Sequence, residues 1–165
     1  MEALEAIRKR RSVRSLTGEP VPQHDLEVIV DAARLAPSGY NRQPWEFIVI
    51  TRRPMIEKLS VVASWVEKSG AIIAVVMDTS SEFWLEDASA AIENMLIAST
   101  ALGYGSCWVE GDSLSREEEL KKLLNIPERL RLISLVTVGI PSEWPDKEKK
   151  SLDSVLHWER YPNPG

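Results

Sequence analysis

Cysteine, histidine and long apolar runs are all scarce in this sequence of 165 residues. The single cysteine, Cys107, cannot form an internal disulfide. The two histidines, His24 and His157, have no cysteine or carboxylate set at ligand spacing around them, so the sequence supports no metal site. The longest apolar run, residues 71–77, has the length of a strand, far below the roughly 20 residues of a membrane-crossing helix. Because the first ten residues also lack a secretory signal, we expect a cytoplasmic protein without a membrane span.

Positive charge is in the minority as well, with 20 lysines and arginines against 25 acidic residues and a net charge of -5. This excess of negative charge argues against a protein that binds nucleic acid through the overall positive charge of its surface. A nucleic-acid binder that uses residues 8–14 is a weaker alternative, because that basic cluster is brief. The length and the apolar fraction of 44% are those of one globular domain, which we expect to span residues 1–165.

The apolar pattern predicts a mixture of helices and strands without strict alternation, which indicates an α+β protein. Residues 71–77 are apolar at every position, as in a central strand that is covered on both faces. Gly103 is expected to end the longest helix, and Ser115 and Glu118 form a predicted capping box for a later one. We expect helices over residues 2–10, 22–36, 55–67, 85–102 and 115–124, and strands over residues 45–51, 71–77, 107–109 and 132–138. Four strands are few for an isolated open sheet, and a partner subunit would add cover.

The C-terminal segment changes in composition after Pro141. Residues 146–150 are all charged, and residues 161–165 are too rich in proline and glycine for a compact element. We therefore expect the tail, about residues 142–165, to lie on the surface of a neighbouring subunit.

Two polar segments could carry chemistry. Residues 10–14 combine three arginines with Ser12, a set suited to binding a phosphate group, although a solvated basic helix end would look the same. The loop of residues 36–45 is dense in amides and hydroxyls, is bounded by prolines and leads into a strand. Loops in such positions often hold ligands, although this one could be a simple polar connection.

In these and further motifs the sequence resembles the FMN-dependent nitroreductase family, in the family's order and over nearly the whole chain. The motifs are Arg10-Arg11-Ser12-Val13-Arg14, residues 36–45 (APSGYNRQPW), residues 86–96 (EDASAAIENML), residues 101–108 (ALGYGSCW), residues 138–141 (VGIP) and residues 149–152 (KKSL) with Val155. The resemblance implies a nitroreductase-like α+β fold, with a central, mostly antiparallel sheet flanked by helices. It also implies an interlocked homodimer with two sites for flavin mononucleotide (FMN) at the interface.

By the family pattern, each FMN site draws on both subunits. The N-terminal arginine segment and the C-terminal lysines would bind the phosphate and ribityl chain, and Arg14 would lie at the pyrimidine edge of the flavin. Reduced flavin is negatively charged there, so a fixed cation stabilises it. The loop would come from the opposite subunit, and the backbone N–H groups after the third strand would face flavin N5. The residues are Arg10, Arg11, Ser12, Arg14, Lys147 and Lys149 from one subunit, Pro37, Ser38, Asn41 and Gln43 from the other, and the main chain of Glu110 and Gly111.

The implied activity is electron transfer from NADH or NADPH through FMN to a small organic acceptor, such as a nitroaromatic or a quinone, by ping-pong turnover. Phe83 and Trp84 could stack over this acceptor or the nicotinamide, or could serve the core or the interface. Larger relatives carry an Asn or Lys between the third helix and the central strand that helps to bind the pyrimidine ring. Here residues 64–70 form a short segment that offers Ser64, Glu67, Lys68 and Ser69, so the way in which the pyrimidine end is held stays open. Two alternatives remain open: a specialised enzyme of the same fold (reductive dehalogenase, flavin-consuming or azoline-oxidising) and a non-catalytic flavin-binding protein.

Overall fold

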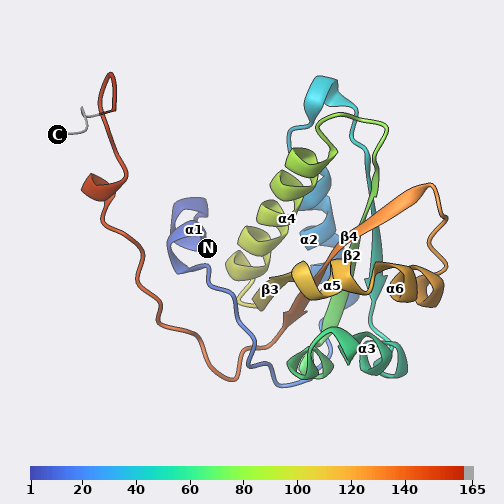
Figure 1. The fold of residues 1–165 in the computed structure, drawn as a ribbon. Coiled ribbons are helices and arrows are strands. Elements are labelled where there is room, and N and C mark those ends of the chain that lie inside the picture. The colour runs from blue at the N-terminus through green and yellow to red at the C-terminus, as the bar shows by residue number, and fades with distance from the viewer. Residues whose placement is uncertain (162–165) are drawn as a thin grey trace.

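The computed structural model describes residues 1–161 and consists of one antiparallel sheet with helices on both of its faces (Figure 1). In these residues the sheet has four strands in the order β1-β2-β4-β3, with every neighbouring pair antiparallel. The strands are β1 (Trp45–Ile50), β2 (Ala71–Asp78), β3 (Gly105–Val109) and β4 (Leu130–Gly139). The helices are α1 (Ala3–Lys9), α2 (Gln23–Arg34), α3 (Arg53–Leu59), α4 (Trp84–Ala101), α5 (Gly111–Ser115) and α6 (Glu117–Leu124). The α+β fold expected from the sequence is confirmed.

The strand β2 lies in the interior of the sheet, as its unbroken apolar sequence predicted. Side chains of successive strand residues point to opposite faces. Ile73 and Val75 accordingly pack into the core beneath α2 and α4, whereas Ile72 and Ala74 pack into a second core with α3 and α6. Seven consecutive residues from Ala71 are therefore buried.

The helix α4 confirms the longest predicted helix and its end. It runs for 18 residues, and Gly103 follows it with a φ of +91°, a left-handed conformation that glycine adopts without strain. The helix packs against α1, α2 and β3, so it connects the N-terminal segment to the sheet.

Two predicted helix boundaries were wrong. The helix expected over residues 55–67 ends at Leu59 and continues as two 3-10 turns on either side of the extended Ala63. Val61 and Val62 weaken a helix only slightly, and packing of Val62 and Val66 into the second core decides the outcome. The capping box is also absent: Ser115 closes α5, and its Oγ donates to the carbonyl of Asp112 at 2.8 Å. The residues after β3 form a short helix of their own, so Ser115 lies at a helix end instead of a helix start.

The helix α1 and the segment that follows β4 lie on the same side of the molecule (Figure 1). In α1 only Ala6 is buried, and Leu4 is 67% exposed. After β4 the chain runs outward with one short turn (Leu152–Ser154), and Val155 and Trp158 are 58% and 78% exposed. The last residues of the predicted tail, 162–165, lie outside the described residues.

Candidate functional site

The predicted phosphate-binding residues from both ends of the chain line one cavity of about 370 Å³. Its lining consists of Arg10, Arg11, Ser12, Arg14, Ser15, Glu143, Pro145, Lys147 and Lys149. Five of these side chains are cationic and one is acidic, so the cavity is suited to a small dianion such as a phosphate group. All six residues that the sequence assigned to this half of the site are thus brought together.

Backbone pairing explains why the two segments meet. Leu16 pairs with Pro141 in an antiparallel bridge, and the N–H of Ser142 donates to the carbonyl of Ser15 at 2.9 Å. On the other side, the N–H of Val13 donates to the carbonyl of Ser106 in β3 at 2.9 Å. The basic segment therefore lies between β3 and the start of the tail.

Arg11 has a role that its sequence motif did not reveal. Its guanidinium donates to the backbone carbonyls of Arg8 and Arg10, both at 2.9 Å, and its Nε donates to the carbonyl of Lys147 at 3.0 Å. These bonds hold the tail lysines beside the N-terminal segment. Arg11 therefore shapes the cavity in addition to lining it.

Arg10 and Arg14 are positioned by partners that the sequence analysis missed. Arg10 forms an ion pair with Glu93 of α4, with 3.2 Å between nitrogen and oxygen. The guanidinium carbon of Arg14 lies 5.7 Å from the centre of the Trp65 ring, within cation–π range. Trp65 belongs to the short segment of residues 64–70, so an aromatic face from this segment stands beside Arg14.

The loop that was predicted to contact FMN from the opposite subunit lies elsewhere in this chain. Its residues contact the first turn of α4, whereas Arg10 pairs with the middle of that helix and Ser12 with β3 beyond it (Figure 1). None of the four predicted residues, Pro37, Ser38, Asn41 and Gln43, lines the basic cavity. One chain therefore does not bring the two halves of the predicted site together.

The loop has an unusual backbone. Tyr40, Asn41 and Gln43 have φ angles of +51°, +56° and +50°, in the left-handed region that costs non-glycine residues about 1 kcal/mol each. Internal hydrogen bonds hold it, since the N–H of Gln43 donates to Ser38 Oγ at 3.0 Å and its Nε2 donates to the carbonyl of Asn41 at 3.2 Å. Strain of this kind is often found where a ligand is held.

The remaining predicted site residues lie on two elements. Glu110 and Gly111 begin α5 directly after β3, and the space beside Gly111 is open, as a backbone contact to a ligand requires. Phe83 lies against the strained loop, with its ring centre 6.0 Å from that of Tyr40, whereas Trp84 packs on the core cluster. Burial raises the pKa of the Cys107 thiol, which agrees with its interpretation as an inert core residue.

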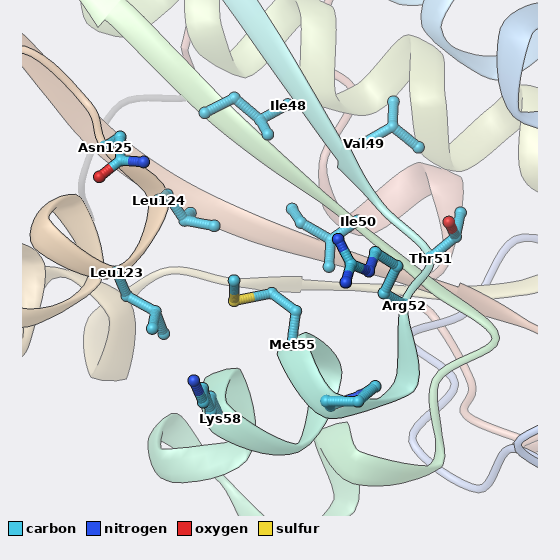
Figure 2. A pocket seen from close by; sticks show the side chains of 11 residues that line it. Ile48, Val49, Ile50, Thr51, Arg52, Met55, Lys58, Leu123, Leu124 and Asn125 are labelled. Carbon is cyan, nitrogen blue, oxygen red and sulfur yellow. The ribbon is translucent and has the colours of Figure 1, made fainter.

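A second cavity, of about 390 Å³, lies along the free edge of β1 between α3 and the end of α6 (Figure 2). Ile50, Met55 and Leu124 give it an apolar lining, and Lys58 stands at its rim. None of the predicted cofactor residues lines it. Within residues 1–161, no group of three or more metal-ligating side chains comes together, and no helix is long and apolar enough to cross a membrane.

Comparison with known proteins gives a consistent result. The model of the Nitroreductase family matches residues 7–67 and 63–140. A protein from Methanothermobacter thermautotrophicus named "Putative NADH dehydrogenase/NAD(P)H nitroreductase" is 35% identical over 169 residues, which cover 98% of this chain and 88% of that protein. A protein of the same name from Archaeoglobus fulgidus is 38% identical over 156 residues, or 88% of each chain.

A solved structure extends the likeness to three dimensions. The crystal structure of a "putative nitroreductase in complex with fmn" from Desulfovibrio desulfuricans superposes with a TM-score of 0.86. It is 32% identical, and the match covers 98% of this chain and 99% of that one. On the family model and these relatives, the chain belongs to the nitroreductase family.

Proposed function

We propose that this protein is an FMN-dependent oxidoreductase that passes electrons from NADH or NADPH to a small organic acceptor. The observation that carries the proposal is the cavity in which cationic side chains from both ends of the chain converge. The relatives named NAD(P)H nitroreductase, and the neighbour solved with FMN, support the same assignment.

In this proposal the cavity holds the phosphate end of FMN. Lys147 and Lys149 neutralise the phosphate together with Arg10, while Ser12 donates to its oxygens or to the ribityl chain. Arg14 lies at the pyrimidine end, fixed against Trp65, where its charge stabilises the reduced cofactor. The open backbone at Gly111 leaves room for the flavin ring to approach. When bound, FMN supplies hydride acceptance at N5 and the onward transfer of electrons.

We further propose that the protein acts as a homodimer, because each chain holds only part of the site. The loop of residues 37–43 then completes the partner's cavity. The exposed apolar residues of the tail would cover apolar surface on the partner, and the groove along β1 is suited to this, since that strand lacks a neighbour on one edge within residues 1–161. Val155 and Trp158, both largely exposed in one chain, would be buried by this contact.

The experiment that tests the function is an absorption spectrum of the purified protein followed by anaerobic titration with each nicotinamide. We expect a flavin spectrum that NADH or NADPH bleaches and that a nitroaromatic or a quinone restores. A bound flavin that neither nicotinamide reduces would indicate the non-catalytic alternative. A protein that takes up no FMN would contradict the proposal altogether.

A pair of variants makes the cofactor assignment specific. Changing both Lys147 and Lys149 to Ala should weaken FMN binding at least about tenfold, because two charge-assisted contacts to the phosphate are lost. Lys122→Ala is the control, since this exposed lysine of α6 lines neither the basic cavity nor the groove beside β1. Equal FMN affinity in the double variant and the control would remove the lysines from the site.

A further inference from the structure

A buried carboxylate connects α4 to the strained loop. Asp87 lies in the first turn of α4 and is only 4% exposed. Its Oδ1 accepts a hydrogen bond from the N–H of Gly39 at 2.9 Å, across 48 residues of sequence. Its Oδ2 is buried and has no hydrogen-bond partner in the part of the chain that the structure describes.

This bond attaches residues 38–43 to the body of the protein. Within residues 1–161, the other hydrogen bonds formed by residues 38–43 stay inside the loop, such as those from Asn41 to Ser38 and from Arg42 to Gly39. These internal bonds fix the loop's own shape but not its place on the molecule. Asp87 fixes that place at Gly39, while the N–H of Asp78 donates to the carbonyl of Pro44 at the end of the loop at 2.8 Å.

Packing against Phe83 holds Gly39 from a second side. A Cβ atom added to Gly39 would lie 2.3 Å from Cδ2 of Phe83, so the phenyl ring fills the space that a side chain would need. Gly39 is therefore held between a carboxylate on α4 and an aromatic ring just before it. The strained residues Tyr40, Asn41 and Gln43 follow directly.

The helix dipole favours a carboxylate in this first turn, but it does not require a buried one. A buried carboxylate oxygen without a partner is destabilising. Ala88 and Ala91, the next buried residues on this helix, show that small apolar side chains suit its packed face. What the carboxylate provides, and alanine would not, is an acceptor for the loop.

We propose that Asp87 is a positioning residue that holds the loop of residues 37–43 in the conformation that contacts FMN in the partner subunit. The inference rests on the proposed function, because it takes the loop's contact with FMN from there. Asp87 itself does not touch the cofactor. It acts through the N–H of Gly39.

The test measures the loop and the cofactor separately in the full-length protein. Hydrogen exchange reports the loop: in Asp87→Ala, the amides of residues 39–43 should exchange at least about tenfold faster, since the bond that protects Gly39 is gone. FMN titration reports the cofactor, and its dissociation constant should rise about tenfold. Asp87→Asn keeps an oxygen acceptor in place, so its affinity should stay within about threefold of the wild type.

The matched control is Glu117→Ala. Glu117 also accepts a backbone N–H through one carboxylate oxygen, its Oε1, from Leu132 at 3.0 Å, but that bond joins α6 to β4, outside the loop. Its removal should leave both measurements unchanged. Should Asp87→Ala fail to fold by circular dichroism, Gly39→Ala replaces it, because the added Cβ displaces the loop from the Phe83 side with the same expected loss of affinity.

Each result of these measurements either supports or contradicts the positioning role of Asp87. Unchanged exchange in Asp87→Ala would overturn the positioning role, and so would faster exchange with unaltered FMN affinity. FMN uptake by the wild type reports the proposed function alone, so a failure there is distinguished from a failure of Asp87 to hold the loop.

Discussion

The Nε of Arg11 donates to the backbone carbonyl of Lys147 at 3.0 Å, so one arginine connects segments 136 residues apart. Two further bonds from the same guanidinium, to the carbonyls of Arg8 and Arg10, leave it little freedom. We expect Arg11→Lys to loosen the tail, because a lysine keeps the charge but not the planar set of donors. FMN affinity should fall about tenfold in a fluorescence titration. Arg8→Lys, in the same basic run but outside the cavity lining, is the control, and equal affinities would contradict this role.

Arg14→Ala should lower both the affinity for FMN and its reduction potential. The fixed cation favours the negatively charged reduced flavin, and a loss of about 1.4 kcal/mol corresponds to about 30 mV for a two-electron couple. Equilibrium titration against a redox dye measures the potential. Arg116→Ala removes an arginine paired with Glu119, outside the cavity, and should leave the potential unchanged. Wild-type values for both quantities would exclude Arg14 from the site.

Val155→Asp should weaken the proposed dimer without unfolding the subunit. Val155 is 58% exposed in one chain, so a charge there costs little unless a partner buries it. Light scattering across a range of concentrations should show dissociation in this variant. Val61→Asp places the same charge on a valine that is 39% exposed in the body and serves as the control. A Val155→Asp protein that stays dimeric at every concentration would argue against burial of this residue.

Tyr104→Phe should destabilise the subunit by about 1–2 kcal/mol at pH 7. The Tyr104 hydroxyl donates to the Asp25 carboxylate at 2.6 Å, which joins the turn after α4 to α2. This hydrogen bond, with burial, raises the pKa of Tyr104 from 10.0 to about 12. Because the folded-state pKa is raised, the stabilisation is complete below pH 10 and is lost as the pH rises through about 12.

Two measurements check this prediction. Urea unfolding at pH 7 gives the change in free energy, with Tyr161→Phe, at an exposed tail tyrosine, as the control. Absorbance titration of the phenolate should lose its component near pH 12 in Tyr104→Phe. A titration curve that keeps this component would show that the hydrogen bond does not govern the pKa.

The parts of the fold that the sequence predicted well are those decided by local pattern. The apolar run of β2 can be buried only on both faces, and Gly103 marks a helix end by its own conformational freedom. The end of α3 at Leu59 was missed because a few β-branched residues weaken a helix only slightly, and packing against the sheet decides the outcome. Ser115 was misjudged because the short helix α5, which the sequence analysis did not predict, ends on this residue, and its hydroxyl donates to the carbonyl of Asp112.

The residues of the candidate site can be separated in the same way, into those that the sequence predicts and those that depend on tertiary packing. The basic cluster of residues 10–14 could be named in advance from its own side chains, and Lys147 and Lys149 from the resemblance to the nitroreductase family. The contacts of Arg14 with Trp65 and of Asp87 with Gly39 could not, since each joins segments about 50 residues apart and depends on how helices pack. The left-handed backbone at Tyr40 and Gln43 also gave no local signal, because neither residue type favours that conformation.

The bridge between Leu16 and Pro141 has a consequence for how the protein matures. A ribosome must complete β4 and release the segment after it before the wall formed by Lys147 and Lys149 exists. A nascent chain that ends before these lysines lacks this wall and contains only part of the lining of the basic cavity. If the basic cavity binds the FMN phosphate as proposed, a chain interrupted before Lys147 would bind the cofactor less tightly than the full chain.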